Sequence, residues 1–123
     1  MATRAVGNPS AFWNNASTGA NTASSVVEMP RDNQTCLFVV TVSGATTITV
    51  EVATALGDNT DGTTKDGAAT NWGALYYTNI PVTMTFSGAG TQAMIIPDFA
   101  PRFVRLKSSN SVTATAGYQT SAG

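Results

Sequence analysis

The 123-residue chain contains no histidine and only one cysteine. Without histidine, histidine-based catalytic triads, histidine metal sites and the commonest general base are all excluded. The cysteine, Cys36, has no second cysteine in the chain with which to form a disulfide. It lies in the apolar run TCLFVVTV, so we expect a small buried side chain and not a reactive thiol.

Charge is also scarce. Charged residues make up 11% of the chain, against about 25% in a typical domain. Six basic and seven acidic residues give a formal net charge of −1, with no basic block that would favour nucleic acid. No apolar run approaches the ~20 residues that span a membrane, and the N-terminus lacks the apolar stretch of a signal peptide. We therefore expect no nucleic-acid partner and no membrane partner. The low charge predicts a surface that is either coated by Thr, Ser, Asn and Gly or partly covered by something else.

What the sequence does contain is a series of seven or eight short segments in which apolar and polar residues alternate, separated by Gly, Pro, Asn or Asp turns. Alternation with a period of two is typical of strands with one buried face. The residues predicted to face inward are Ile48, Val50, Val52, Val82, Met84, Phe86, Val104, Leu106, Val112, Ala114 and Ala116. No window has the apolar spacing of a helix. The pattern predicts an all-β domain, an antiparallel β-sandwich or jelly roll.

The run TCLFVVTV at 35–42 is apolar on both faces, which predicts a central buried strand. We expect the following SGAT turn to fold this strand and strand 46–54 into a hairpin. After the Gly-rich turn at 87–90, we expect strand 91–97 to pair back on strand 82–86.

Residues 1–24 differ in composition from the rest and predict an extended N-terminal arm, followed by a β-sandwich domain at 25–123. Ordering one residue's backbone costs roughly 1–2 kcal/mol, and the arm and the C-terminal segment GYQTSAG offer few large apolar groups in return. We therefore expect both ends to pack on neighbouring subunits. The predicted partner-interface residues are Phe12, Trp13, Asn14 and Tyr118.

The polar loop at 56–71 contains the most site-like group of carboxylates. Asp58, Asp61 and Asp66 are possible oxygen ligands for calcium, but their spacing is not that of an EF-hand loop, and Lys65 among them opposes a cation. A solvated loop with Asp-Gly turns is the favoured interpretation, so we expect no metal and no cofactor. The remaining acidic residues do not group into a catalytic pair, which predicts that the chain is not an enzyme and has no catalytic residues.

The aromatic segment NWGALYY raises a second possibility. Trp72, Tyr76 and Tyr77 are candidates for a stacking surface that binds sugars, although a buried tryptophan with tyrosines at its rim is the favoured interpretation. A carbohydrate-binding or host-adhesion module is accordingly the alternative function.

The small all-β chain, its Ser/Thr/Ala/Asn-rich arm and the ending FVRLKSS-NSVTATAG at 103–117 resemble the small virion proteins of tailed bacteriophages. Within that group the chain is most similar to capsid decoration, or cement, proteins. The resemblance implies a non-enzymatic protein on the capsid surface of the virion, made in the host cytoplasm. It would bind the major capsid protein and neighbouring copies of itself as a homo-oligomer, and stabilise the assembled shell. A phage tail or head-completion protein remains a further alternative.

Overall fold

The alternating segments form strands in the computed structural model, which describes residues 5–29, 34–53, 72–99 and 101–122. The described part of the chain is all-β. Seven strands are longer than two residues: β1 (Ala5–Ser17), β4 (Gln34–Val42), β5 (Thr46–Ala53), β9 (Thr83–Phe86), β10 (Gly90–Phe99), β11 (Phe103–Ser108) and β12 (Thr113–Ala122). Five are two-residue strands: β2 (Thr22–Ala23), β3 (Val27–Glu28), β6 (Gly73–Ala74), β7 (Tyr76–Tyr77) and β8 (Ile80–Pro81).

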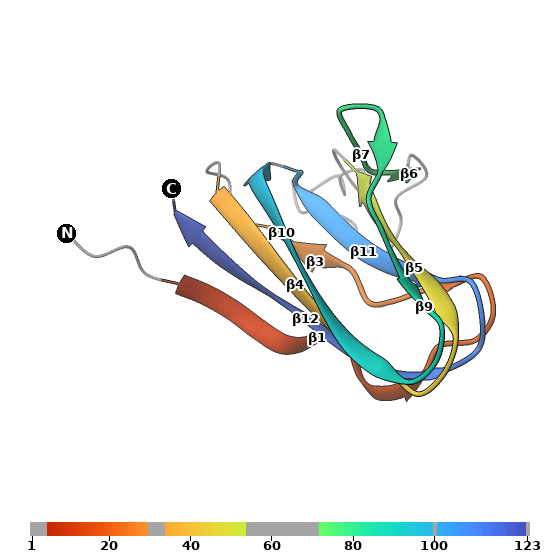
Figure 1. Ribbon diagram of the computed structural model, residues 1–123. Helices are drawn as coiled ribbons and strands as arrows, with labels where there is room; N and C mark the ends of the chain where they lie inside the picture. Colours follow the sequence, from red (N-terminus) through yellow and green to blue (C-terminus); the bar gives the residue numbers. More distant parts are fainter. Residues whose placement is uncertain (1–4, 30–33, 54–71, 100, 123) are drawn as a thin grey trace, which may run out of the picture.

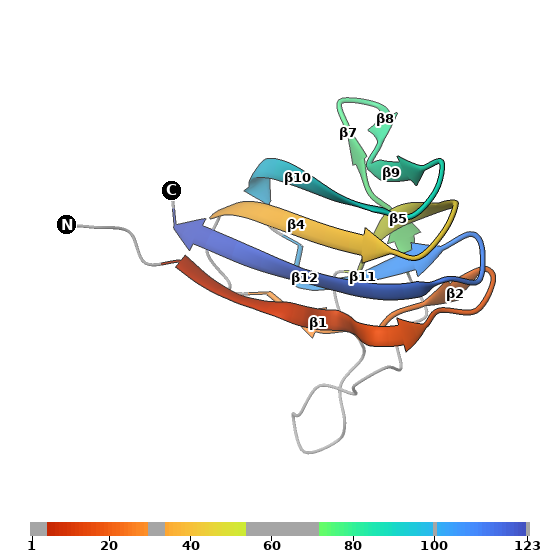
Figure 2. The ribbon, with the colours of Figure 1, turned by 60° about the horizontal axis from the view of Figure 1, so that its bottom comes forward.

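These strands build two antiparallel sheets that pack face to face (Figures 1 and 2). Sheet A has the order β1-β12-β4-β10. Sheet B has the order β2-β11-β5-β6, with β3 also paired to β11 and β9 also paired to β5. The hairpin of β7 and β8 projects from the sandwich beside sheet B (Figure 2). The predicted antiparallel sandwich is therefore confirmed.

The core lies between the sheets and consists of the apolar positions of the alternating strands. Phe38 and Val40 of β4 are fully buried, as are Val104 and Leu106 of β11 on the opposite sheet. The predicted inward residues are buried with one exception, Val52, which is partly buried against the core. Local alternation thus identified the buried face of every strand that it described.

The two predicted hairpins are wrong. β4 belongs to sheet A, where it pairs with β12 and β10, whereas β5 belongs to sheet B and pairs with β11, β6 and β9. The turn between them leads from one sheet to the other. In the same way β9 pairs with β5 and β10 pairs with β4, so the turn at 87–89 also crosses the sandwich. Strands that face each other across a core show the same alternation as strands that pair, so the pattern did not distinguish the two cases.

The expectation that the N-terminal segment needs a neighbouring subunit for its order does not hold. β1 pairs with β12 from Ala5↔Ser121 to Ser17↔Thr113, with two register shifts, and forms an edge of sheet A. Phe12 and Trp13 are 2% and 6% exposed and belong to the chain's own core. The Phe12 ring lies 5.9 Å from the Phe38 ring centroid. The hydrogen-bond ladder with β12 and the burial of these two side chains order the segment within its own chain. We had expected contacts with a second chain to do so.

A buried hydroxyl network fixes the corner where β11 turns into β12. The Thr46 and Ser108 hydroxyls lie 2.7 Å apart, and the backbone N–H of Asn110 donates to Thr46 Oγ1 at 3.1 Å. Thr18, just after β1, donates its hydroxyl to the Asn110 carbonyl and accepts from the N–H of Val112. The network therefore joins the end of β1 to both sheets and holds the two terminal strands in place.

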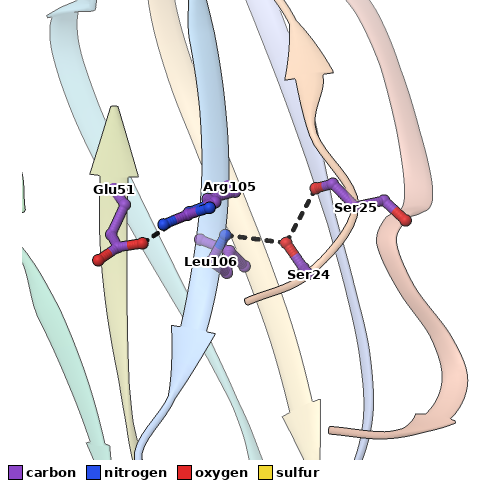
Figure 3. Close-up of polar contacts among 5 residues, drawn as sticks. All are labelled: Ser24, Ser25, Glu51, Arg105 and Leu106. Carbon is purple, nitrogen blue, oxygen red and sulfur yellow. Dashed lines mark hydrogen bonds and ion pairs between the residues drawn. The ribbon is translucent and has the colours of Figure 1, made fainter. Parts of the chain in front are cut away.

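The outer edge of β11 is covered by the segment that follows β1. β2 and β3 each pair with β11, and Ser24 lies between them. The Ser24 hydroxyl accepts from the Leu106 N–H at 2.9 Å and donates to the Ser25 carbonyl at 3.0 Å (Figure 3). The described residues 5–24 thus contribute to both sheets, and the boundary predicted at residue 24 has no counterpart in the strand pairing.

Candidate functional site

The outer face of sheet A is formed by the residues that alternate with the core positions. On β4 these are Leu37, Val39 and Thr41, which alternate with buried residues of the same strand. Val39 lies between Gly117 of β12 and Ala93 of β10 in the strand register. Val39 is 40% exposed, and β4 therefore has one apolar face in the core and one that is partly open to solvent.

Ile95 extends this apolar surface to the edge of the sheet. It lies opposite Leu37 in the register of β10 and β4, and 67% of its surface is exposed. On the far side of the Val39–Ala93 row, the hydroxyls of Thr41 and Thr91 bond to each other at 2.8 Å. These threonines satisfy each other's hydrogen bonding and leave the apolar side chains as the main feature of the face. We call this surface, made of Leu37, Val39, Thr41, Thr91, Ala93, Ile95, Thr115, Gly117 and Gln119, the A face.

A groove of about 460 Å³ lies on the A face between β1 and β4. Gly7, Asn8 and Pro9 line it from β1, Leu37 and Val39 line it from β4, and β12 lies between the two strands. No Asp, Glu, Lys or Arg lines the groove. It therefore offers apolar contact and uncharged hydrogen-bonding groups, which suit binding and not proton transfer.

The absence of charge extends over the strands of sheet A. Asp98, near the end of β10, is the one charged residue within β1, β4, β10 and β12. In sheet B, by contrast, β5 carries Glu51 and β11 carries Arg105 and Lys107. The two sheets of the sandwich thus have chemically different outer surfaces.

The charged residues of sheet B form a defined cross-strand contact. Arg105 Nε donates to Glu51 Oε1 at 2.7 Å, between neighbouring strands (Figure 3). The Arg105 guanidinium also lies 4.3 Å from the centroid of the Trp72 ring, a cation–π contact. Trp72 packs in addition against Ala53 and Phe103, so its ring has structural neighbours within the domain.

The predicted sugar-binding aromatics are not brought together into one stacking surface. Trp72 is half-buried beside Arg105, whereas Tyr76 and Tyr77 are exposed on the projecting hairpin. Successive residues of a strand point to opposite sides, so the two tyrosines do not share a face. This arrangement corresponds to the favoured interpretation, in which Trp72 has a packing role.

The predicted partner-interface residues are divided between the core and the surface. Phe12 and Trp13 lie in the core of the same chain and are not accessible to a partner. Asn14 is exposed on β1, and Tyr118 is half-buried with its ring edge-on to Phe12 at 6.1 Å. The prediction that Asn14 and Tyr118 contact a partner is untested.

Cys36 is a buried core residue, as expected. It is 0% exposed, and burial raises the pKa of its thiol from 9.0 to about 12. Asp58, Asp61 and Asp66 lie outside the described residues. Within the residues that the structure does describe, no cluster of three or more Cys, Asp or Glu side chains is arranged to hold a metal ion.

Sequence reasoning missed Val39 and Ile95 as candidate functional residues. The signal for Val39 was present, because the run at 35–42 is apolar on both faces. It was interpreted as burial on both sides, whereas the structure covers only one side.

No protein-family model matches the chain, and no curated protein matches it in sequence. In the described ranges there is no helix long and apolar enough to cross a membrane. The function therefore has to be argued from the surfaces of the sandwich.

Proposed function

We propose that this chain is a non-enzymatic structural protein of a virion, which binds the outer surface of an assembled phage capsid and stabilises it. The observation that carries the proposal is the A face. Val39 and Ile95 are exposed there on a sheet with one charged residue in its four strands. Contiguous exposed apolar surface surrounded by uncharged polar groups is typical of a protein–protein contact.

The difference between the two sheets supports an orientation on the shell. If the A face contacts the major capsid protein, the outer face of sheet B, with Glu51, Arg105 and Lys107, points to solvent. Desolvating charged groups is costly, and interface centres are depleted of them. The chain would then cover apolar surface with one side and keep its charged groups, including the Arg105–Glu51 pair, out of the interface.

We also propose that the sandwich is a jelly roll. In chain order the strands belong to the sheets as follows: β1 in A, β2 and β3 in B, β4 in A, β5, β6 and β9 in B, β10 in A, β11 in B and β12 in A. With β2 and β3 taken as one interrupted strand, the orders β1-β12-β4-β10 and β2/β3-β11-β5-β9 are those of two interlocked Greek keys. Viral capsid domains and lectins both use this architecture. The separation of Trp72 from the exposed tyrosines favours the shell protein over the lectin.

The virion assignment is tested by finding where the native chain resides. A lysate of the cells that naturally produce the chain is separated on a density gradient, and a specific antibody detects the chain in each fraction. We expect it to sediment with intact shells that contain the major capsid protein. Recovery of the chain only in the free-protein fractions would overturn the assignment.

The docking surface is tested with two charge-introducing variants of similar chemistry. Val39→Lys places a charge in the centre of the A face, and Thr83→Lys places one on the exposed side of β9 in sheet B. Added to purified shells that lack the chain, Val39→Lys should bind at least tenfold more weakly than the wild type, and Thr83→Lys should bind normally. Equal binding by the two variants would exclude the A face as the docking surface.

A further inference from the structure

The exposed edges of a β-sheet are templates for pairing with another strand, and proteins usually protect them. Three of the edges in the described sandwich are short or irregular. β1 contains Pro9, two register shifts and Asn15 at φ 49°. The edge of β11 is covered by the two-residue strands β2 and β3, and the other edge of sheet B is made of β6 and the four-residue β9.

The fourth edge, β10, has none of these protections over most of its length. It pairs with β4 in unbroken register from Gly90↔Val42 to Ile96↔Cys36, and the shift in register comes only after Ile96. No charged residue and no proline occurs between Gly90 and Ile96. No described strand pairs with its outer side. Every second residue of such a strand directs its N–H and C=O away from the sheet.

β10 is also tied to the opposite sheet. The Gln92 side chain donates from Nε2 to the Thr85 carbonyl on β9 at 2.7 Å, which ties the edge to the other sheet. Ile95 stands beside this edge on the A face with 67% of its surface in solvent. The edge thus combines unpaired backbone groups with exposed apolar surface.

We propose that β10 is the edge through which two copies of this chain pair, antiparallel to each other about a twofold axis. In an antiparallel pair about a twofold axis, the residue at the axis lies opposite itself, and every other residue lies opposite the residue at the same distance on the far side of the axis. A charge on the strand would therefore be repeated on the partner strand within the same ladder. β10 carries no charge from Gly90 to Pro97, and it is therefore electrostatically compatible with itself. The four-stranded sheet A of each copy would continue into the other, and Ile95 would be covered.

This inference deepens the proposed function. The role that we give to the pairing rests on the proposed function, whereas the pairing itself does not. The pairing would join two A faces into one larger docking surface for a shell. It requires no shell to form, so it can be measured on the purified chain. A chain that dimerises through β10 but is never found with shells would retain this inference and lose the proposed function.

The test measures the self-association of the full-length chain by sedimentation velocity over a range of concentrations. The wild type should show a monomer–dimer equilibrium. Ile95→Lys should raise the dimer dissociation constant at least tenfold, because it places a charge on each strand of the new pair, on a side chain that the partner copy would cover. Ile80→Lys is the matched control, since Ile80 is 65% exposed but lies on the projecting hairpin, away from β10. It should leave the dissociation constant unchanged.

Two further measurements distinguish pairing through the edge from packing through the A face. In the wild-type dimer, amides of alternate residues in β10 should exchange with solvent more slowly than in the monomer formed by Ile95→Lys. Val39→Lys changes the face one strand away from the edge and should still dimerise. A wild type that stays monomeric, equal effects of Ile95→Lys and Ile80→Lys, or loss of the dimer in Val39→Lys would each overturn the proposal.

Discussion

Gly117 lies in the middle of β12, where the backbone of β1 approaches it closely. A Cβ atom added to Gly117 would come closer than 3.0 Å to the carbonyl oxygen of Asn8 and to the carbonyl group of Pro9, an approach that real Cβ atoms essentially never make. The atoms it meets belong to backbone and cannot rotate away as a side chain would. We therefore predict that Gly117→Ala displaces β1 from β12.

The expected loss of stability has two parts. Overpacking at a rigid site costs typically 1–3 kcal/mol. Displacing β1 also loosens Phe12 and Trp13, whose full burial contributes about 1.5–3 kcal/mol each. If roughly half of that burial is lost, the free energy of unfolding falls by about 2.5–6 kcal/mol in total. For a domain of this size the melting temperature should fall by on the order of 10 °C or more.

The measurement is urea unfolding followed by tryptophan fluorescence, with Gly90→Ala as the matched control. Gly90 lies on β10 in the same sheet, and an added Cβ there meets nothing within 4 Å. Replacing glycine by alanine at a tolerant position restricts the unfolded chain and stabilises by about 0.4–1 kcal/mol. The two variants should therefore change stability in opposite directions. A Gly117→Ala protein as stable as Gly90→Ala, with β1 amides still protected from exchange, would refute the close approach of β1.

Three further changes test other parts of the sandwich. Phe12→Ala should destabilise the isolated chain by about 3–5 kcal/mol in urea unfolding because it empties a core position, whereas Asn14→Ala should be close to neutral; equal effects would mean that β1 does not pack on its own domain. Thr46→Val removes the partner of the buried Ser108 hydroxyl and the acceptor of the part-buried Asn110 N–H, and should cost about 1–3 kcal/mol by the same assay; a neutral result would mean that the corner network adds no stability. For Cys36 we expect no reaction with a disulfide reagent at pH 8 in the folded chain. Its thiol pKa is raised, so the unfolded chain loses this proton first and stability should fall between pH 9 and about 12; Cys36→Ala should remove that part of the slope.

The fold class and the core could be predicted because both depend on local alternation. Met84 and Phe86, for example, are separated by one threonine and lie in the core, and each is 4% exposed. Which strand pairs with which is a different kind of information. β4 and β5 face each other across the core, and their alternation is the same as that of two strands in a hairpin. Only the long-range pairing of β4 with β12 and of β5 with β11 resolves the difference.

The prediction for the N-terminal segment was wrong because it counted the burial of apolar side chains and left out the backbone hydrogen bonds that the segment makes as a strand. A strand of 13 residues on the edge of a sheet gains a ladder of hydrogen bonds as well as burial. A signal for this pairing was present in the sequence. A glycine inside a strand often marks the close approach of another backbone, and both Gly7 and Gly117 lie where the other strand leaves no room for a Cβ.

The apolar run at 35–42 connects the sequence to the proposed interaction. Its apolar residues on both faces predict burial of both sides of one strand, and the sandwich fully buries only the face that carries Phe38 and Val40. The other face, with Val39, remains in solvent next to an edge strand that also lacks charge. A sequence that makes both faces of its central strand apolar is consistent with a domain that completes its burial on a partner. Val39→Lys then tests whether a shell covers the A face, and Ile95→Lys tests whether a second copy pairs along the β10 edge.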